Sequence, residues 1–318
     1  MFHSLFASIT APDIAYGVGA IFLFLYLVLS SIEFGAALYL FLPEKLLERE
    51  TIRSYVNPIW ETTNIFLIFF VMILFTCFPK AMPLLSPLLF PVIYIALVFF
   101  IVRIIGILGL FYGDSGRMPW RLAFFVGSWG AALTLSNFYH VMVTGMRMPW
   151  PLDVLSISLI LLVITTILLI SSTFFLEYTQ RKAFHPYLAR LCYFALLVWY
   201  GAAALYLTGP FRTAPYALAH LSAATNGFIA VTIVALSIPI FVHFRLFTWS
   251  FLAACTAFGM LFFGSVYLHL PYLVYPSVTV TAAFTSVAVF HSILISGAVG
   301  FIFLIPALFL LYWLFALG

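Results

Sequence analysis

Three ionisable side chains interrupt otherwise apolar stretches of the sequence and are the strongest candidates for chemistry. Glu33 and Arg103 each stand about nine residues before the end of a long apolar stretch, which corresponds to about 14 Å in a helix. Glu61 stands near the start of the apolar stretch that lies between them. Charged groups inside a membrane are costly, so they are usually paired or functional. These positions therefore predict either an ion pair or a path for protons.

The residues leave both interpretations open. In the first, Glu33 and Arg103 form a structural ion pair, and Glu61 is a solvated carboxylate in the first turn of its helix, where the helix dipole favours negative charge. In the second, the carboxylates carry protons inward from the cytoplasm, with Glu61 near the mouth of the path and Glu33 deeper. Three hydroxyl groups are candidates to link the two carboxylates, those of Ser30, Ser31 and Thr62.

Histidine and cysteine side chains are weaker candidates, in their case for a cofactor or metal site. His140, His220, His269 and His291 lie in or near apolar stretches, and haem ligation in a helical bundle requires ligands on facing helices at one depth. His140 and His269 both fall near the external face, and we interpret them as interfacial histidines. The cysteines match no disulfide framework, zinc site or haem-attachment motif (Cys77, Cys192 and Cys255). We therefore predict no metal site and no haem ligand in this chain.

The composition places these residues in a membrane protein. Of the 318 residues, 65% are hydrophobic and only 7% are charged, whereas a soluble domain carries about 25% charged residues. These values exclude an ordinary soluble enzyme and a disordered chain. The net charge of +4 is small and scattered along the sequence, so there is no basic footprint for nucleic acid.

Nine apolar stretches are long enough to cross a membrane as helices, which takes about 20 residues. They cover roughly 12–42, 58–78, 86–112, 120–145, 152–178, 185–208, 217–243, 247–270 and 284–316. Proline and glycine clusters separate them. Since no connection is long enough to fold separately, we predict a single polytopic, all-α membrane domain over residues 1–318.

The distribution of Lys and Arg predicts the orientation. Of the 13 basic residues, nine follow the first, third, fifth and seventh stretches, three follow the second, fourth and sixth, and the last is Arg103. Cytoplasmic loops are enriched in Lys and Arg, so the N-terminus is expected outside and the C-terminus in the cytoplasm. Three tryptophans are predicted as aromatic anchors at the membrane interface (Trp129, Trp150 and Trp199).

Several motifs around these residues resemble those of one known family. Residues 31–35 read Ser-Ile-Glu-Phe-Gly, similar to the family's Gly-Phe-Asp-Met-Gly with Glu in place of Asp, and residues 58–64 contain its Pro-x-Trp-acid pattern. Further matches follow in order through most of the chain, which resembles subunit II of the cytochrome bd-type quinol oxidases. The resemblance rests on the three ionisable residues and on Gly35, Trp60, Trp120, Gly127 and Ser128.

The resemblance implies a fold of two four-helix bundles with one peripheral helix, in pseudo-repeat halves at about 12–145 and 152–270 and an extra helix at about 284–316. It implies a non-haem subunit of an oxygen-reducing quinol oxidase that is not catalytic alone. A haem-bearing subunit I would hold haem b and haem d, and this chain would support it and contribute a proton-uptake route from the cytoplasm. A small single-helix subunit and membrane lipid are further expected partners, in the bacterial cytoplasmic (inner) membrane.

Two other functions remain as alternatives. The chain could serve as the membrane subunit of a different quinone-linked redox complex, which the sequence does not separate from the oxidase. It could also be a transporter or ion-path protein without redox function, for which inverted repeats and broken helices near the midplane would be the signature. The only hint of the latter is the pair Gly106 and Gly109 near Arg103.

Overall fold

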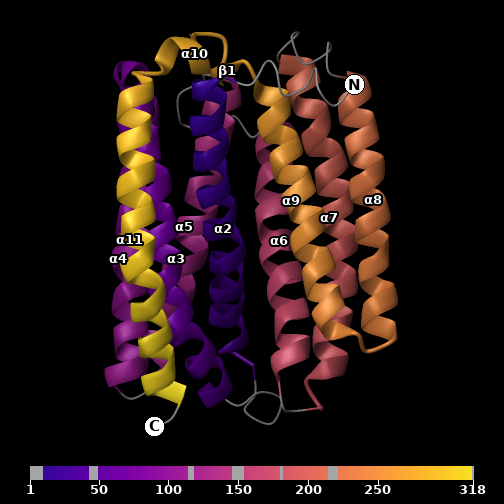
Figure 1. Cartoon of the computed structure of the whole chain (residues 1–318). Helices are drawn as coiled ribbons and strands as arrows, with labels where there is room; N and C mark the ends of the chain where they lie inside the picture. Colours follow the sequence, from indigo (N-terminus) through magenta and orange to yellow (C-terminus); the bar gives the residue numbers. More distant parts are fainter. Residues whose placement is uncertain are drawn as a thin grey trace.

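The computed structural model describes residues 10–42, 49–113, 118–144, 154–179, 182–213 and 221–316. The side chains of 49–61, 208–213, 221, 223 and most positions after 300 lie outside that description. Within these ranges the chain forms nine long helices, which run alternately up and down (Figure 1). They are α2 (Ala11–Tyr39), α3 (Arg49–Cys77), α4 (Met82–Tyr112), α5 (Met118–Thr144), α6 (Val154–Tyr178), α7 (His185–Thr213), α8 (Leu221–His243), α9 (Phe247–His269) and α11 (Val287–Ala316).

The helices are arranged as two four-helix bundles side by side, α2–α5 and α6–α9, and α11 packs on α3 at the outer side of the first bundle (Figure 1). This confirms the predicted all-α membrane fold. Among the described residues, six helices are long and apolar enough to cross a membrane, and two shorter apolar segments lie in α3 and α11. The number of nine spans and the relation of the halves as a repeat stay predictions.

Most helix boundaries agree with the prediction, but the second helix begins much earlier. It was expected from residue 58, where the apolar stretch begins. Instead α3 begins at Arg49 and continues through Pro58. Proline within a helix loses one backbone hydrogen bond without necessarily ending the helix. A hydropathy pattern detects the apolar part of such a helix and misses its polar extension.

The segment between α9 and α11 was expected as a connection and contains a small hairpin. Strands β1 (Tyr272–Val274) and β2 (Val278–Thr279) pair antiparallel, and the single turn α10 (Val280–Ala283) follows. Leu273 and Val274 are buried in a cluster with Phe78, which follows α3. The hairpin and α10 therefore cover one end of the first bundle, which we call the hairpin end (Figure 1).

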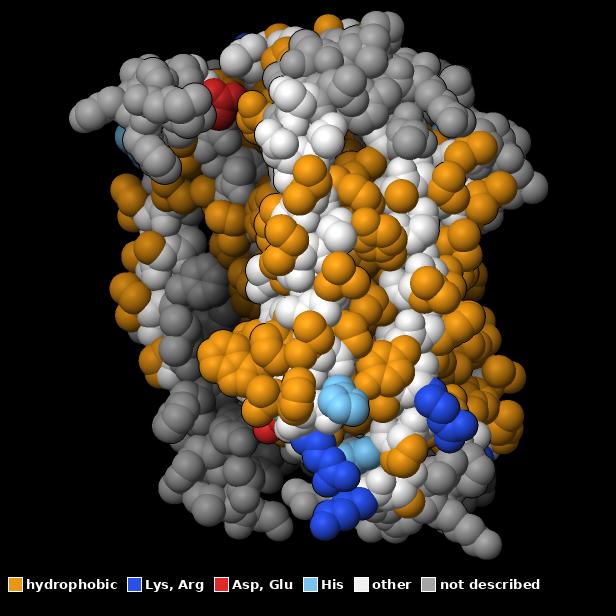
Figure 2. Space-filling model, turned by 90° about the vertical axis from the view of Figure 1, so that its right-hand side faces the viewer, with side chains coloured by type: hydrophobic (Ala, Val, Ile, Leu, Met, Phe, Trp, Pro, Cys, Tyr) orange, Lys and Arg blue, Asp and Glu red, His pale blue; other side chains and the backbone are white. Residues whose placement is uncertain are grey.

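The opposite end carries the connections α4–α5, α6–α7 and α8–α9, and we call it the basic end. The Lys and Arg residues at this end whose side chains the structure describes are Arg121, Lys182, Arg190 and Arg245. Figure 2, which views the molecule from the side of α8, shows Lys and Arg gathered at this end and hydrophobic side chains spread over the middle. An apolar outer surface of this kind suits contact with lipid or with another membrane chain.

One of the three tryptophans predicted as interface anchors lies in the protein interior. Trp199 is fully buried, and its Nε1 donates a hydrogen bond to Thr166 Oγ1 at 2.9 Å. Trp129 is partly buried and bonds to the backbone of Phe34. The prediction of interface anchors is wrong for Trp199, because the second bundle provides an interior partner for its indole. Trp150 lies outside the described residues.

Candidate functional site

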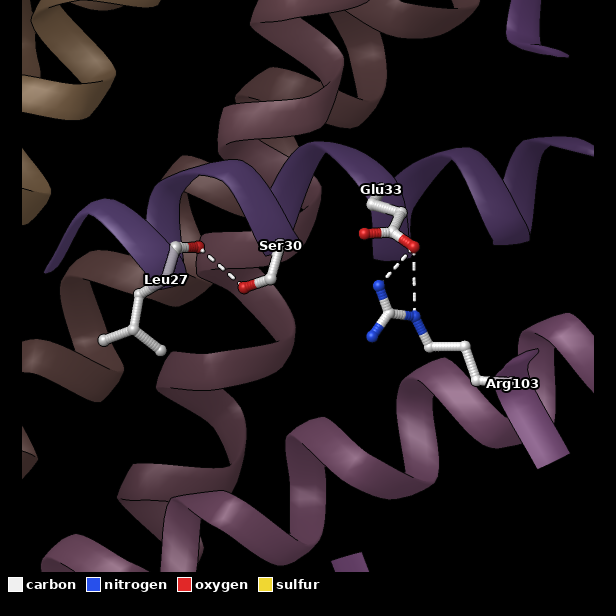
Figure 3. Close-up of polar contacts among 4 residues, drawn as sticks. All are labelled: Leu27, Ser30, Glu33 and Arg103. Carbon is white, nitrogen blue, oxygen red and sulfur yellow. Dashed lines mark hydrogen bonds and ion pairs between the residues drawn. The ribbon is translucent and has the colours of Figure 1, made fainter. Parts of the chain in front are cut away.

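The centre of the site is a buried ion pair between α2 and α4. Arg103 Nε donates to Glu33 Oε1 at 3.0 Å, and a second guanidinium nitrogen, Nη2, contacts the same oxygen (Figure 3). Glu33 is 0% and Arg103 1% exposed. The sequence-predicted partners therefore meet, and each offsets the cost of burying the other.

Aromatic rings complete the environment of the guanidinium. The Arg103 Cζ atom lies 5.2 Å from the ring centroid of Phe34 and 5.7 Å from that of Phe100. A cation over an aromatic face is attracted by the ring quadrupole, and the attraction grows when water is excluded. Phe34 follows Glu33 directly in sequence, so α2 supplies both the anion and one of the rings.

Two of the predicted motif residues set the helix spacing around the pair. A Cβ atom at Gly127 of α5 would overlap the backbone of Arg103, so only glycine lets α5 approach α4 this closely. A Cβ atom at Gly35 of α2 would overlap the side chain of Ser171 in α6. Gly35 therefore allows the first bundle to meet the second one just beside Glu33, where Tyr39 also bonds to Ser171 at 2.9 Å.

The other motif residues on α5 pack beside these contacts. Trp120 lies against Gly109 of α4, where a Cβ atom would overlap the indole ring. Ser128 is fully buried next to Gly127. Trp129 Nε1 donates to the carbonyl oxygen of Phe34 at 2.9 Å, which ties α5 to the turn of α2 that carries Glu33.

The candidate hydroxyl groups on α2 are buried but already donate locally. Ser30 Oγ and Ser31 Oγ both donate to the carbonyl oxygen of Leu27, at 3.2 Å and 2.6 Å. Their oxygens can still accept hydrogen bonds. Ser30 stands one turn before Glu33 on the same side of the helix, and the second carboxylate oxygen of Glu33 points away from the guanidinium (Figure 3). Thr62 on α3 is partly buried.

We expected Glu61 in the first turn of its helix, but it does not lie there. It stands twelve residues after the start of α3 at Arg49, about 18 Å along the helix at 1.5 Å per residue. Phe22 of α2 stacks on Phe69 of α3 with ring centroids 5.1 Å apart, and this antiparallel register places position 61 level with roughly residue 30 of α2. Position 61 is thus within about one helical turn of Glu33 in depth, and which of the two carboxylates lies nearer the cytoplasmic mouth stays a prediction. The side chains of Glu61 and Trp60 lie outside the described residues.

The histidines near the hairpin end are buried, contrary to the interfacial interpretation. His140 Nδ1 lies 3.4 Å from Ser156 Oγ, and His269 Nε2 lies 3.3 Å from the carbonyl oxygen of Leu273. The hairpin and α6 cover these side chains, which hydropathy alone could not predict. His291 is exposed, and His220 lies outside the described residues. No group of three or more His, Cys, Asp or Glu side chains suited to a metal ion occurs in the part of the chain that the structure describes.

Sequence reasoning missed one polar residue of the site, Tyr26. Its side chain is 1% exposed, and its hydroxyl lies within electrostatic range of both Arg103 and Glu33. Tyr26 precedes Glu33 by seven residues, a spacing that returns to the same face of a helix. That spacing was the available signal, but a tyrosine in an apolar stretch is more often simple core packing.

Long apolar helices around a desolvated ion pair define a polytopic helical membrane protein with a polar site inside its first bundle. The chain belongs to the family of cytochrome bd terminal oxidase subunit II, whose sequence model matches residues 11–315. A solved structure described as the bd oxidase from Geobacillus thermodenitrificans is similar over 98% of this chain and all of that chain, with 25% identity and a TM-score of 0.85. Comparison with curated proteins gave no significant match.

Family membership settles the coarse function. The chain is a multi-pass subunit of a respiratory quinol oxidase, an oxidoreductase complex of the bacterial inner membrane, and its relatives imply a haem-bearing partner subunit. This favours the oxidase interpretation over a transporter without redox function.

Proposed function

We propose that this chain supports the haem-bearing subunit I and supplies a proton-uptake route to it through Glu61 and Glu33. Reduction of oxygen to water consumes protons, so the complex needs a path that brings them into the membrane. The observation that carries the proposal is the buried Glu33, whose Oε1 binds Arg103 while its Oε2 has no hydrogen-bond partner among the described residues. A carboxylate with one oxygen held and the other open is suited to receive and release a proton.

Glu61 is the second carrier in this route. The register of α2 and α3 supports this role, because position 61 of the neighbouring helix stands at nearly the depth of Glu33. Ser30 and Ser31 on α2 and Thr62 on α3 are the candidate hydroxyl groups near this depth. A proton would move between the carboxylates through these hydroxyl oxygens or water, because each can accept one hydrogen bond while it donates another.

The proposal assigns the redox chemistry to the partner. Haem b and haem d would be held by subunit I, quinol would be the substrate, and neither His140 nor His269 would ligate iron. His269 Nε2 faces the carbonyl oxygen of Leu273, which suits a protonated nitrogen and not an iron ligand.

The basic end would face the cytoplasm, with the N-terminus outside, because Arg121, Lys182, Arg190 and Arg245 lie there and Lys80 lies at the hairpin end. A small single-helix subunit and lipid would complete the assembly.

Substitution of Glu61 tests the route. Glu61→Gln keeps the shape of the side chain but cannot carry a proton, so oxygen uptake driven by quinol should fall while haem content and assembly stay intact. Glu61→Asp should keep much of the activity. Glu177→Gln is a matched control, because Glu177 is an exposed carboxylate at the end of α6. Full turnover in Glu61→Gln would move the proton route elsewhere, most directly into the partner subunit.

A further inference from the structure

Two buried oxygen atoms beside the ion pair have no hydrogen-bond partner among the described residues. They are Glu33 Oε2 and the hydroxyl oxygen of Tyr26. Both side chains belong to α2, both are at most 1% exposed, and Tyr26 lies within electrostatic range of Glu33 and Arg103. Buried polar groups are nearly always bonded to protein or to ordered water, so each unbonded one needs an explanation.

The neighbouring protein groups do not satisfy these two oxygens. The hydroxyl groups of Ser30 and Ser31 donate to the carbonyl oxygen of Leu27. The guanidinium nitrogens Nε and Nη2 of Arg103 are directed at Glu33 Oε1. What remains is a carboxylate oxygen that needs a donor and a phenol hydroxyl that needs an acceptor. A water molecule supplies both functions, since it donates two hydrogen bonds and accepts two.

Seven residues of helix separate Tyr26 from Glu33 along α2, so their Cα atoms stand about 10 Å apart along the helix axis. Ser30 lies between them in sequence and on the same side of α2 as Glu33 (Figure 3). Its Oγ donates to Leu27 and can still accept a hydrogen bond. It provides an intermediate point for a short file of waters.

We propose that ordered water molecules are bound inside the first bundle along α2, held by Glu33 Oε2 at one end and by the Tyr26 hydroxyl at the other, with Ser30 Oγ between them. Tyr26 is a positioning residue for this water and has no redox role. If the proposed function holds, the water extends the proton route from Glu33 toward the middle of the membrane. The water site itself is defined by the unbonded oxygens and stands independently of that route.

Thermal stability of the assembled complex tests the water site. If water bonds to the Tyr26 hydroxyl, Tyr26→Phe removes a satisfied group, and the midpoint of thermal unfolding should fall. If the hydroxyl is dry and unbonded, Tyr26→Phe removes a desolvated group with no partner, and the midpoint should rise. Tyr39→Phe is the matched control, because Tyr39 is also buried on α2 and its hydroxyl is bonded to Ser171. Its midpoint should fall, as expected for loss of a satisfied hydroxyl.

A structure of the complex at a resolution that shows water provides the direct measurement. The proposal expects density within hydrogen-bond distance of Glu33 Oε2 and of the Tyr26 hydroxyl, with the density at position 26 lost in Tyr26→Phe. Absence of density at both oxygens, or a protein side chain bonded to them instead, would overturn it. Neither readout depends on oxygen uptake, so full turnover in Glu61→Gln would refute the proton route and leave the water site standing.

Discussion

The buried pair of Glu33 and Arg103 shows how a single interaction makes a membrane interior tolerate charge. Both side chains are sealed from solvent, and the guanidinium also faces the rings of Phe34 and Phe100. Neither charge would be stable there alone, because the protein interior cannot replace the hydration that it removes. The two residues therefore have to be considered as one unit.

Substitution of one partner should damage the complex more than substitution of both. Arg103→Leu leaves the Glu33 carboxylate uncompensated, which costs about 3–5 kcal/mol for a buried pair. The double variant Glu33→Leu with Arg103→Leu leaves no such charge and should assemble better. The measurement is the yield and thermal unfolding of the purified complex. A double variant that is less stable than Arg103→Leu would show that the residues are not partners.

Only those residues of the site whose types are rare in apolar stretches could be predicted from the sequence. Glu33 and Arg103 stood out because charge is scarce in apolar stretches, and the structure brings them together. Tyr26 did not stand out, because tyrosine is common in such stretches and only its contacts reveal its role. Glu61 was placed too near the start of its helix, since the polar first part of α3 carries no hydropathy signal.

At the scale of elements, small residues decide how closely the helices approach. Gly127 of α5 lies against the backbone of Arg103 in α4, and Gly106 of α4 lies against the backbone of Phe124 in α5. Each helix therefore contributes a glycine to their close contact. Helix association in membranes depends on such close packing, because lipid provides no hydrophobic drive between apolar helices. The position of the Arg103 side chain thus depends on Gly127, which has no side chain of its own.

Gly127→Val should therefore disrupt the complex. The added side chain cannot fit without moving α5 away from α4, which would pull Arg103 away from Glu33. Haem content and yield of the purified complex should fall sharply. Gly201→Ala in α7 is the matched control, because a Cβ atom there meets nothing within 4 Å, and that variant should assemble normally. Normal assembly of Gly127→Val would contradict the packing observed at this position.

The helices themselves could be predicted well, because each needs one long apolar stretch and the breaks between them carry Pro and Gly. The hairpin could not, since strands of two and three residues are too short to show alternation. It is held by burial of Leu273 and Val274 against residues far away in sequence. The buried state of His269 follows from the same tertiary contact, which no local pattern contains.

At the scale of the whole molecule, the chain presents an apolar surface that a single subunit does not need. Large apolar side chains are exposed along α4 and α8, among them Phe90, Tyr94, Ile233 and Leu236. The family implies a haem-bearing partner for part of this surface, and we expect lipid to cover the rest. The chain is therefore understood as one subunit of a membrane complex.

The proposal that subunit I holds the haems predicts that this chain ligates none. His140→Ala and His269→Ala should each leave the haem absorption bands of the purified complex unchanged in position and in intensity per complex. Some loss of stability is expected for His269→Ala, because the ring contacts the hairpin through Leu273. Loss of one haem band in either variant, at normal assembly, would assign an iron ligand to this chain.

The central claim is that Glu33 carries protons and does not merely neutralise Arg103. The double variant Glu33→Gln with Arg103→Gln tests it most directly, because it removes both charges, keeps groups that can hydrogen-bond, and leaves no uncompensated ion. The complex should assemble with its full haem content, while quinol-driven oxygen uptake falls by about tenfold or more, as expected when a proton carrier is lost. Full oxygen uptake at full haem content would contradict the claim and reduce the pair to a structural role.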